Sequence, residues 1–478
     1  MIRNASDNVI GISEKNPHYF RYKGKEILLL TTAEHYGAVI SKTFDYTRYF
    51  DALAAYGLNY TRIYPGGFVE YAGKWMPDDN MAPGPDLIVP WARSDVPGYK
   101  NGGNKFDLDR WDPEYFARLR DFLGEAEKRG IIIEICFFNC QFEDYWPNSP
   151  LHKDANIQGV GDCEATACQT LDNEALVREQ LKYIEKLIIE TNGFDNVIYE
   201  FVDESSSHPI HTHKIFHWIS KMIDTAVAAE EKLPKKHLLA QQLEIGVDFC
   251  ADDRIGLIVT QYIKLIGRQV GGVPALDNCY DHGKPIEINE TAYINSWIKD
   301  DAYDLVAISR LEAWEFMVGG GAAFNQLNGY FNVPNPSGES AANRKVMQGL
   351  RNLRTFLEGF DYVKMTRDRR LVRSVLNGKR SVPFGASVNA ISEKGRQHAI
   401  YIHHSFPDIG GGSWYEPNFG DYEPVIRIAP DAGEYRVSYV EPASLKVLKE
   451  EIIICDGAGI ELVCPAYTLD LAIKIISV

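Results

Sequence analysis

The sequence predicts an α/β protein in which a (β/α)8 barrel is followed by an antiparallel β-sandwich. Eight strand-like apolar runs, alternating with helical segments, occur over roughly the first 360 residues, a pattern typical of this barrel. After about Tyr362 the helical segments stop, and short strands follow one another at sandwich spacing. The length of 478 residues also favours two domains. We expect a barrel with an N-terminal hairpin at 1–362 and a sandwich at 363–478.

The barrel elements are predicted from apolar periodicity and from turn residues. A hairpin at 19–25, turning at Gly24, precedes the first strand. The Asp112-Pro113 pair predicts a helix start, Asp172 is expected to cap the next helix, and Gly57 and Gly130 predict helix ends. Strands are expected at 27–30, 58–64, 131–138, 196–204, 238–243, 255–262, 284–290 and 317–326, and helices at 47–56, 113–129, 173–190, 211–230, 304–316 and 344–357.

Two further regions have no barrel periodicity. Residues 68–109 are rich in Gly, Pro, Asp and Trp, and a connection of this length is typical of a binding loop or lid. The sandwich strands are expected at 371–376, 387–390, 398–403, 425–428, 435–440, 445–449 and 461–463.

The composition restricts the partners and the compartment. Fifty basic against sixty-six acidic side chains give a net charge of −16, which argues against nucleic-acid phosphates and anionic membranes as partners. No run of eighteen apolar residues occurs, and the N-terminal segment lacks a signal-peptide core. We expect a cytoplasmic protein, although a secreted chain whose signal has been removed has the same appearance.

The eight cysteines form no Cys-x-x-Cys pair and no dense framework. Free and mostly buried thiols are therefore expected. A Cys163–Cys168 disulfide in an oxidising compartment is the alternative.

Two predicted strands end in carboxylates. Residues 196–204 finish on Asp203-Glu204, and residues 284–290 finish on Glu290. Charge at the end of a buried strand indicates a site, and the carboxyl ends of barrel strands share one face. Two carboxyls about 5 to 5.5 Å apart are what double displacement at a sugar carbon requires. The alternative is that each glutamate caps a helix or forms a salt bridge.

These strand ends resemble those of a known superfamily. Tyr-Glu-Phe-Val-Asp-Glu at 199–204 resembles the Tyr-Glu-x-x-Asn-Glu ending of strand four in retaining (β/α)8 glycoside hydrolases, which include cellulases and β-galactosidases. Pro-Ile-Glu-Ile-Asn-Glu at 285–290 is similar to their strand-seven ending. The resemblance covers about residues 15–362 and implies Glu204 as acid/base and Glu290 as nucleophile.

Other motifs extend the resemblance. Asn-Tyr-Thr-Arg at 59–62 is similar to the superfamily's strand-two motif, which implies that Arg62 supports the nucleophile. Tyr262 matches the position of a tyrosine that hydrogen-bonds the nucleophile. Residues 33–38 and the Gly-Gly-Gly-x-x-Phe-Asn stretch also resemble uncharacterised cellulase-like hydrolases.

Asp203 departs from the superfamily pattern, which has Asn before the acid/base to help bind the sugar 2-hydroxyl. A second carboxylate beside Glu204 raises the pKa of at least one of them by repulsion, which helps to keep an acid protonated. A different hydroxyl configuration at that sugar carbon is an equal alternative. A third is that Asp203 is itself the acid, in which case Asp203→Asn abolishes activity and Glu204→Gln leaves much of it.

Further substrate-binding candidates lie at strand ends and in loops. Glu34 and His35 end strand one and are candidates for sugar hydroxyls, with a core histidine and its partner as the alternative. Loop aromatic rings stack on sugars, or pin their own loops. The other candidates are Asn139, Trp146 and Trp75 in loops, and Phe324 and Asn325 at the floor of the site.

No metal or cofactor is expected. The His-x-His pairs open a predicted helix rather than end a strand. His213 and His217 are four residues apart, but no Glu lies between them as it does in zinc-binding helices. No phosphate-binding glycine motif is present, and Gly319-Gly-Gly321 is a poor dinucleotide signature. The histidines concerned are His208, His211, His213 and His217.

The sequence therefore favours a retaining glycoside hydrolase acting on an oligo- or polysaccharide. Two alternatives stay open: a sugar isomerase or lyase that uses a metal or a Lys/His base at the same mouth, and a non-catalytic carbohydrate-binding barrel. The sugar, the linkage, exo or endo action, the oligomeric state and the role of the C-terminal domain are not encoded in these patterns.

Overall fold

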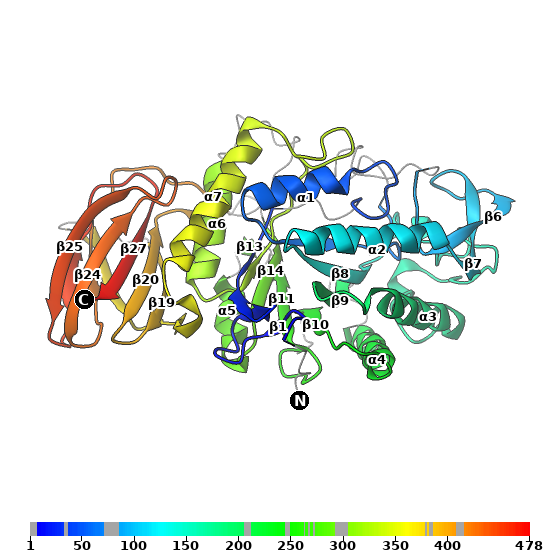
Figure 1. Ribbon diagram of the computed structural model, residues 1–478, viewed down its shortest axis with the longest axis horizontal. Coiled ribbons are helices and arrows are strands. Elements are labelled where there is room, and N and C mark those ends of the chain that lie inside the picture. The colour runs from blue at the N-terminus through cyan, green and yellow to red at the C-terminus, as the bar shows by residue number, and fades with distance from the viewer. Residues whose placement is uncertain are drawn as a thin grey trace.

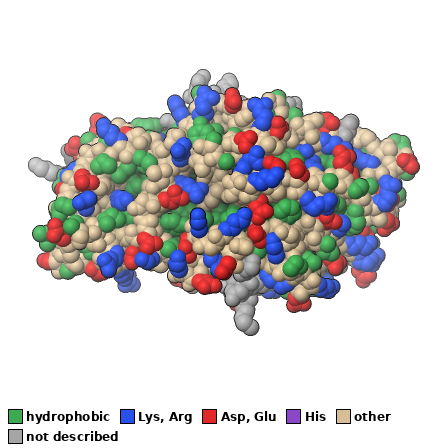
Figure 2. Space-filling model, in the orientation of Figure 1, with side chains coloured by type: hydrophobic (Ala, Val, Ile, Leu, Met, Phe, Trp, Pro, Cys, Tyr) green, Lys and Arg blue, Asp and Glu red, His purple; other side chains and the backbone are tan. Residues whose placement is uncertain are grey.

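The computed structural model describes residues 7–32, 37–70, 86–204, 212–243, 249–261, 263–265, 268–270, 273–291, 305–377, 380–381, 386–407 and 415–478. Figure 1 shows an α/β barrel beside an all-β region, with the helices α6 (Leu305–Val318) and α7 (Ala341–Glu358) between them. Basic and acidic side chains are interspersed over the face in Figure 2. Of the described helices, none combines the length and apolar character that a membrane span needs.

Eight parallel strands form the barrel, as predicted. From the second strand to the eighth, each strand pairs with the next one in the chain, and the eighth pairs with the first. The seam therefore lies between the first and second strands. The strands are β4 (Leu29–Leu30), β5 (Tyr60–Ile63), β8 (Ile132–Asn139), β9 (Val197–Asp203), β10 (Leu238–Gln242), β11 (Leu257–Gln261), β14 (Ile286–Glu290) and β15 (Ala323–Phe324).

Asn59 joins the seam between β4 and β5. Its backbone N–H donates to the Leu30 carbonyl at 3.2 Å, its Oδ1 accepts the Leu30 N–H at 3.1 Å, and its Nδ2 donates to the Leu28 carbonyl at 2.9 Å. The side-chain amide thus satisfies backbone groups that a strand partner would otherwise satisfy.

The remaining helices surround the barrel, and their ends follow the predicted signals. Asp112 accepts hydrogen bonds from the N–H groups of Glu114 and Tyr115, with Pro113 at the first helical position. Gly57 and Gly130 follow helix ends with φ near +70°. These helices are α1 (Tyr46–Ala55), α2 (Pro113–Lys128), α3 (Glu174–Thr191), α4 (Thr212–Glu231) and the short α5 (Val273–Cys279).

Three local predictions are wrong. Asn173, not Asp172, caps α3, because its Oδ1 accepts the Leu176 N–H while Asp172 forms an ion pair with Lys214. The eighth strand does not begin at residue 317. Helix α6 continues through Val318, because its last two residues complete a buried apolar face before the glycines end the helix.

The third correction concerns residues 68–109, which contain a hairpin rather than only loop. Strands β6 (Trp91–Pro97) and β7 (Asn104–Trp111) pair antiparallel, and Trp91 stacks on Tyr183 at 5.1 Å. Pairing of the two strands and burial of Trp91 favour a hairpin here, although the Gly and Pro residues disfavour strands. Trp75 lies outside the described residues.

A small N-terminal sheet precedes the barrel, as predicted. It consists of β1 (Gly11–Ile12), β2 (Phe20–Tyr22) and β3 (Lys25–Ile27), with the turn at Lys23-Gly24. Two further pairs of short antiparallel strands are β12 (Ile263–Leu265) with β13 (Arg268–Val270), and β21 (Phe406–Pro407) with β22 (Tyr415–Glu416).

The C-terminal region is a sandwich of two antiparallel sheets, as predicted. Ile400 and Ile473 of one sheet share a core with Ile426 and Leu462 of the other. The first sheet has the order β16 (Thr366–Arg367), β19 (Ser387–Glu393), β20 (Gln397–His403), β27 (Asp470–Ser477), β24 (Gly433–Val440) and β25 (Val447–Cys455), and the second β18 (Arg380–Ser381), β17 (Val372–Asn377), β23 (Pro424–Ile428) and β26 (Ile460–Val463).

Helix α6 connects the barrel to the sandwich through buried contacts. Trp314 stacks on Tyr401 with ring centroids 5.7 Å apart, and Arg310 pairs with Asp470 at 2.8 Å. The domain boundary at 362/363 stays a prediction.

Candidate active site

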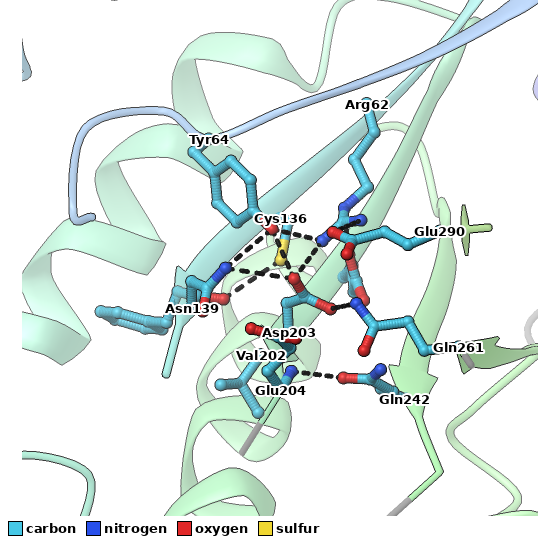
Figure 3. A network of polar contacts seen from close by, with 12 residues as sticks. Arg62, Tyr64, Cys136, Asn139, Val202, Asp203, Glu204, Gln242, Gln261 and Glu290 are labelled. Carbon is cyan, nitrogen blue, oxygen red and sulfur yellow. Dashed lines mark hydrogen bonds and ion pairs between the residues drawn. The ribbon is translucent and has the colours of Figure 1, made fainter. Parts of the chain in front are cut away.

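Six barrel strands bring polar side chains together near their carboxyl ends (Figure 3). The group combines acidic, basic and amide side chains, most of them fully buried. Its members are Arg62 near the end of β5, Asn139 at the end of β8, Asp203 and Glu204 at the end of β9, Gln242 at the end of β10, Gln261 at the end of β11 and Glu290 at the end of β14.

Arg62 lies at the centre of the group and is fully buried. Its Nε is 3.1 Å from Glu200 Oε2, its Nη2 is 2.6 Å from Asp203 Oδ2, and its Nη1 is 3.2 Å from Glu290 Oε1. Burial alone would lower the pKa of Arg62. The negative charge of Asp203 and the other neighbours raise it by more, so the pKa of Arg62 lies well above its ordinary value. One permanent cation thus contacts three carboxyl groups.

Asp203 accepts hydrogen bonds from four donors. Besides Arg62, these are the Tyr64 hydroxyl at 2.5 Å and Asn139 Nδ2 at 3.1 Å, both on Oδ2, and Gln261 Nε2 at 3.1 Å on Oδ1. The side chain has no solvent exposure. Because every described partner donates, this environment stabilises a carboxylate and argues against Asp203 as the proton donor.

Glu290 is buried to 2% exposure at the end of β14. Burial and the negative charges of Asp203 and Glu204 raise the pKa of Glu290 well above its usual range, and Arg62 opposes the rise. The two glutamates predicted as a pair are therefore electrostatically coupled.

Glu204 is the half-buried member of that pair. Its backbone has φ of +54°, and its N–H donates to Gln242 Oε1. This position after the last residue of β9 gives it more solvent contact than Asp203 or Glu290.

A second layer of carboxyl groups lies deeper in the barrel. The Tyr60 hydroxyl donates to Glu287 Oε1 at 2.6 Å and also hydrogen-bonds to Glu134 Oε2. A hydroxyl carries one hydrogen, so the second bond requires a proton on one of these carboxyls. Burial raises the pKa of Glu287 to about 8 and that of Glu134 well above its ordinary value.

The sequence prediction missed several of these residues. Glu200 and Glu287 lie within the two motifs that ended in candidate carboxylates, and charged residues inside buried strands were the available signal. Gln242 and Gln261 carry no motif, because their roles arise from strands that meet only in the fold.

Other predicted residues lie apart from this network or outside the described ranges. Trp146 is buried, donates from Nε1 to the Cys163 carbonyl at 2.8 Å and meets His152 edge-on, so its described contacts are with its own loop. Asn325 is fully buried after β15, and its side-chain amide has no hydrogen-bond partner in the structure as described. Glu34, His35 and Tyr262 lie outside the described residues.

The cysteines and the potential metal ligands are further chemically reactive groups in the sequence. All eight cysteines are free, and all but Cys163 are buried. Across the described ranges, no group of three or more His, Cys, Asp or Glu side chains is arranged to hold a metal ion. His208 and His211 lie outside those ranges.

Comparison with known proteins gives a likeness in fold. No protein-family model matches the chain, and no curated protein sequence matches it. A glycoside hydrolase family 5 protein from Bacteroides vulgatus ATCC 8482 superposes with a TM-score of 0.65 at 10% identity, covering 98% of this chain and 94% of that one. A solved structure described as a glycoside hydrolase gives 0.63 at 11% identity, covering 98% and 97%. At these identities the likeness establishes the shared fold.

Proposed function

We propose that this protein is a glycoside hydrolase that cleaves an oligo- or polysaccharide by retaining double displacement. The observation that carries the proposal is the contact of Arg62 with both Asp203 and Glu290, which joins the ends of β5, β9 and β14 into one charged site. The shared fold of a protein described as a family 5 glycoside hydrolase supports it.

In the first step, Glu290 attacks the anomeric carbon and Glu204 protonates the leaving oxygen. The guanidinium of Arg62, 3.2 Å from Glu290, favours the ionised form that a nucleophile requires. Glu204, which is half-buried and not a described partner of Arg62, is the group suited to carry the exchangeable proton.

In the second step, Glu204 removes a proton from water, and the hydroxide equivalent releases the sugar from Glu290. The two inversions restore the original anomeric configuration. Asp203 takes no part in proton transfer in this scheme, because it holds Arg62 and three neutral donors.

The test is a panel of nitrophenyl glycosides and of plant and host glycans. Wild type is compared with Glu290→Gln, Glu204→Gln and, as a matched control, Glu185→Gln on the exposed face of α3. We expect the first two substitutions to abolish or strongly reduce turnover and the control to leave it unchanged. NMR of the first-formed product should show retained configuration, and an inverted product contradicts the mechanism.

The alternative functions give different results in the same experiment. If the protein is a non-catalytic carbohydrate-binding barrel, wild type binds glycans but does not cleave them. Glu290→Gln then changes neither glycan binding nor turnover by much. Turnover that a chelator abolishes favours a metal-dependent isomerase or lyase.

A further inference from the structure

Glu204 has an unusual backbone conformation for a residue with a side chain. Its φ of +54° lies in the left-handed region, which Cβ disfavours. Lys23 and Leu445, the other described non-glycine residues in this region, lie in hairpin turns. Glu204 instead follows a barrel strand directly, so its surroundings must hold this conformation.

The side chain of Gln242 contacts the backbone of Glu204. Strand β9 ends its ladder at Asp203, whose carbonyl accepts the Cys140 N–H at 2.8 Å. The next N–H, that of Glu204, donates instead to Gln242 Oε1 from the end of β10 (Figure 3). Gln242 is itself 4% exposed, so the acceptor is buried, while the Glu204 donor is half-buried.

The neighbouring strand restrains the preceding residue. Gln261, at the end of β11, donates from Nε2 to Asp203 Oδ1 at 3.1 Å. Two glutamines on successive strands therefore fix Asp203 through its side chain and Glu204 through its backbone. Only the second contact bears directly on the acid/base, because the Glu204 carboxyl moves with its own backbone.

We propose that Gln242 is a positioning residue for the acid/base: its side-chain oxygen holds the Glu204 backbone in the left-handed conformation and so sets where the Glu204 carboxyl meets the leaving group. This inference rests on the proposed function. Gln242 acts through Glu204 and has no assigned contact with the substrate.

The proposal predicts a dependence on the leaving group. Dinitrophenolate leaves without protonation, whereas a sugar or alkyl alcohol needs the proton of Glu204 to leave. Misplacing Glu204 therefore slows glycosylation only with poor leaving groups. A general loss of fold or of the nucleophile would slow all substrates alike.

The test uses the full-length chain and two substitutions. Gln242→Met keeps the length of the side chain and removes the acceptor oxygen. Gln241→Met is the matched control, because Gln241 is also buried but donates to the carbonyls of Val202 and Gln242. Circular dichroism and thermal unfolding establish folding, and Gln242→Asn, which withdraws the amide by one methylene, replaces Gln242→Met if that variant does not fold.

The readout is kcat/KM for dinitrophenyl, nitrophenyl and unactivated glycosides of a sugar that wild type cleaves. For Gln242→Met we expect at most about a two-fold loss on the dinitrophenyl glycoside and about a 10- to 100-fold loss on the unactivated one, within the range that general acid catalysis supplies. Gln241→Met should keep the wild-type dependence on the leaving group.

Two results overturn the inference: an equal loss on all substrates, or no loss on any. Either result with an active wild type leaves the proposed function intact. A wild type that cleaves no glycoside contradicts the proposed function, and the positioning role with it.

Discussion

Arg62 lies 2.6 Å from the carboxylate of Asp203 and 3.2 Å from that of Glu290, so the proposed nucleophile shares its cation with a fully buried neighbour. In the superfamily that the strand ends resemble, the position of Asp203 is held by a neutral Asn. The additional charge changes the electrostatics of Glu290.

Replacing Asp203 by Asn should move the acid limb of the pH profile of kcat/KM to lower pH. Asp203 raises the pKa of Glu290, so removing its charge lowers that pKa and keeps the nucleophile ionised in more acidic solution. We expect a shift of roughly one pH unit, with activity retained. Asp95→Asn on the exposed part of β6 serves as the control. An inactive but folded Asp203→Asn variant, together with much activity left in Glu204→Gln, would instead identify Asp203 as the acid.

Removing the cation should destabilise the barrel. Arg62→Met leaves three buried carboxyl groups without their counter-ion, which costs about 3–5 kcal/mol when a buried pair loses one partner. Ionised carboxyls cause this cost, so the loss measured by urea unfolding should be larger at pH 8 than at pH 5. A loss that does not depend on pH would mean that packing, not charge, dominates at this position.

Glu287 should make stability decrease as pH rises. Its pKa is about 8 in the folded chain, above its unfolded value, so the folded state holds a proton that the unfolded state loses from about pH 4.5 upward. This group's contribution falls by about 1.4 kcal/mol per pH unit up to about pH 8 and then levels off. Glu287→Gln should remove this slope from urea unfolding measured between pH 5 and 8, whereas Glu185→Gln should leave it. An unchanged slope in Glu287→Gln would show that the shared proton resides elsewhere.

The seam of the barrel should depend on one amide. Asn59→Ala removes the partners of the Leu30 N–H and of the Leu28 carbonyl, and each unsatisfied buried group costs about 1–3 kcal/mol. We therefore expect a larger loss in chemical unfolding than the roughly 1 kcal/mol that Asn173→Ala should cost by removing a helix cap. Equal losses would show that water or backbone movement satisfies the seam.

The sequence predicted the barrel because apolar strands and helices alternate with clear end signals. It failed where a local pattern was ambiguous. Met317 and Val318 are as suitable for a buried helix end as for a strand, and only the fold decides between them. Strand β27, which lies inside the larger sandwich sheet, was not predicted, although the apolar run at 471–476 was an available strand signal.

The candidate site was predictable to the extent that it depends on strand ends. Glu204, Glu290 and Arg62 were found because each lies in or at the end of a predicted strand, whereas Asn139 was predicted in a loop and is the last residue of β8. Gln242 could not be found in this way, because nothing in the sequence distinguishes a functional neutral amide from an ordinary one. Its contact with the backbone of Glu204 is visible only in the fold. Cytoplasmic location stays a prediction from the N-terminal sequence.

Trapping of the glycosyl-enzyme tests the central claim most directly. A 2-deoxy-2-fluoro glycoside of the sugar that the panel identifies slows release of the intermediate, so the sugar accumulates on the nucleophile. Peptide mass spectrometry should then find the label on Glu290, and Glu290→Gln should remain unlabelled. A label on another residue, or rapid turnover with an inverted product and no label, would contradict the account.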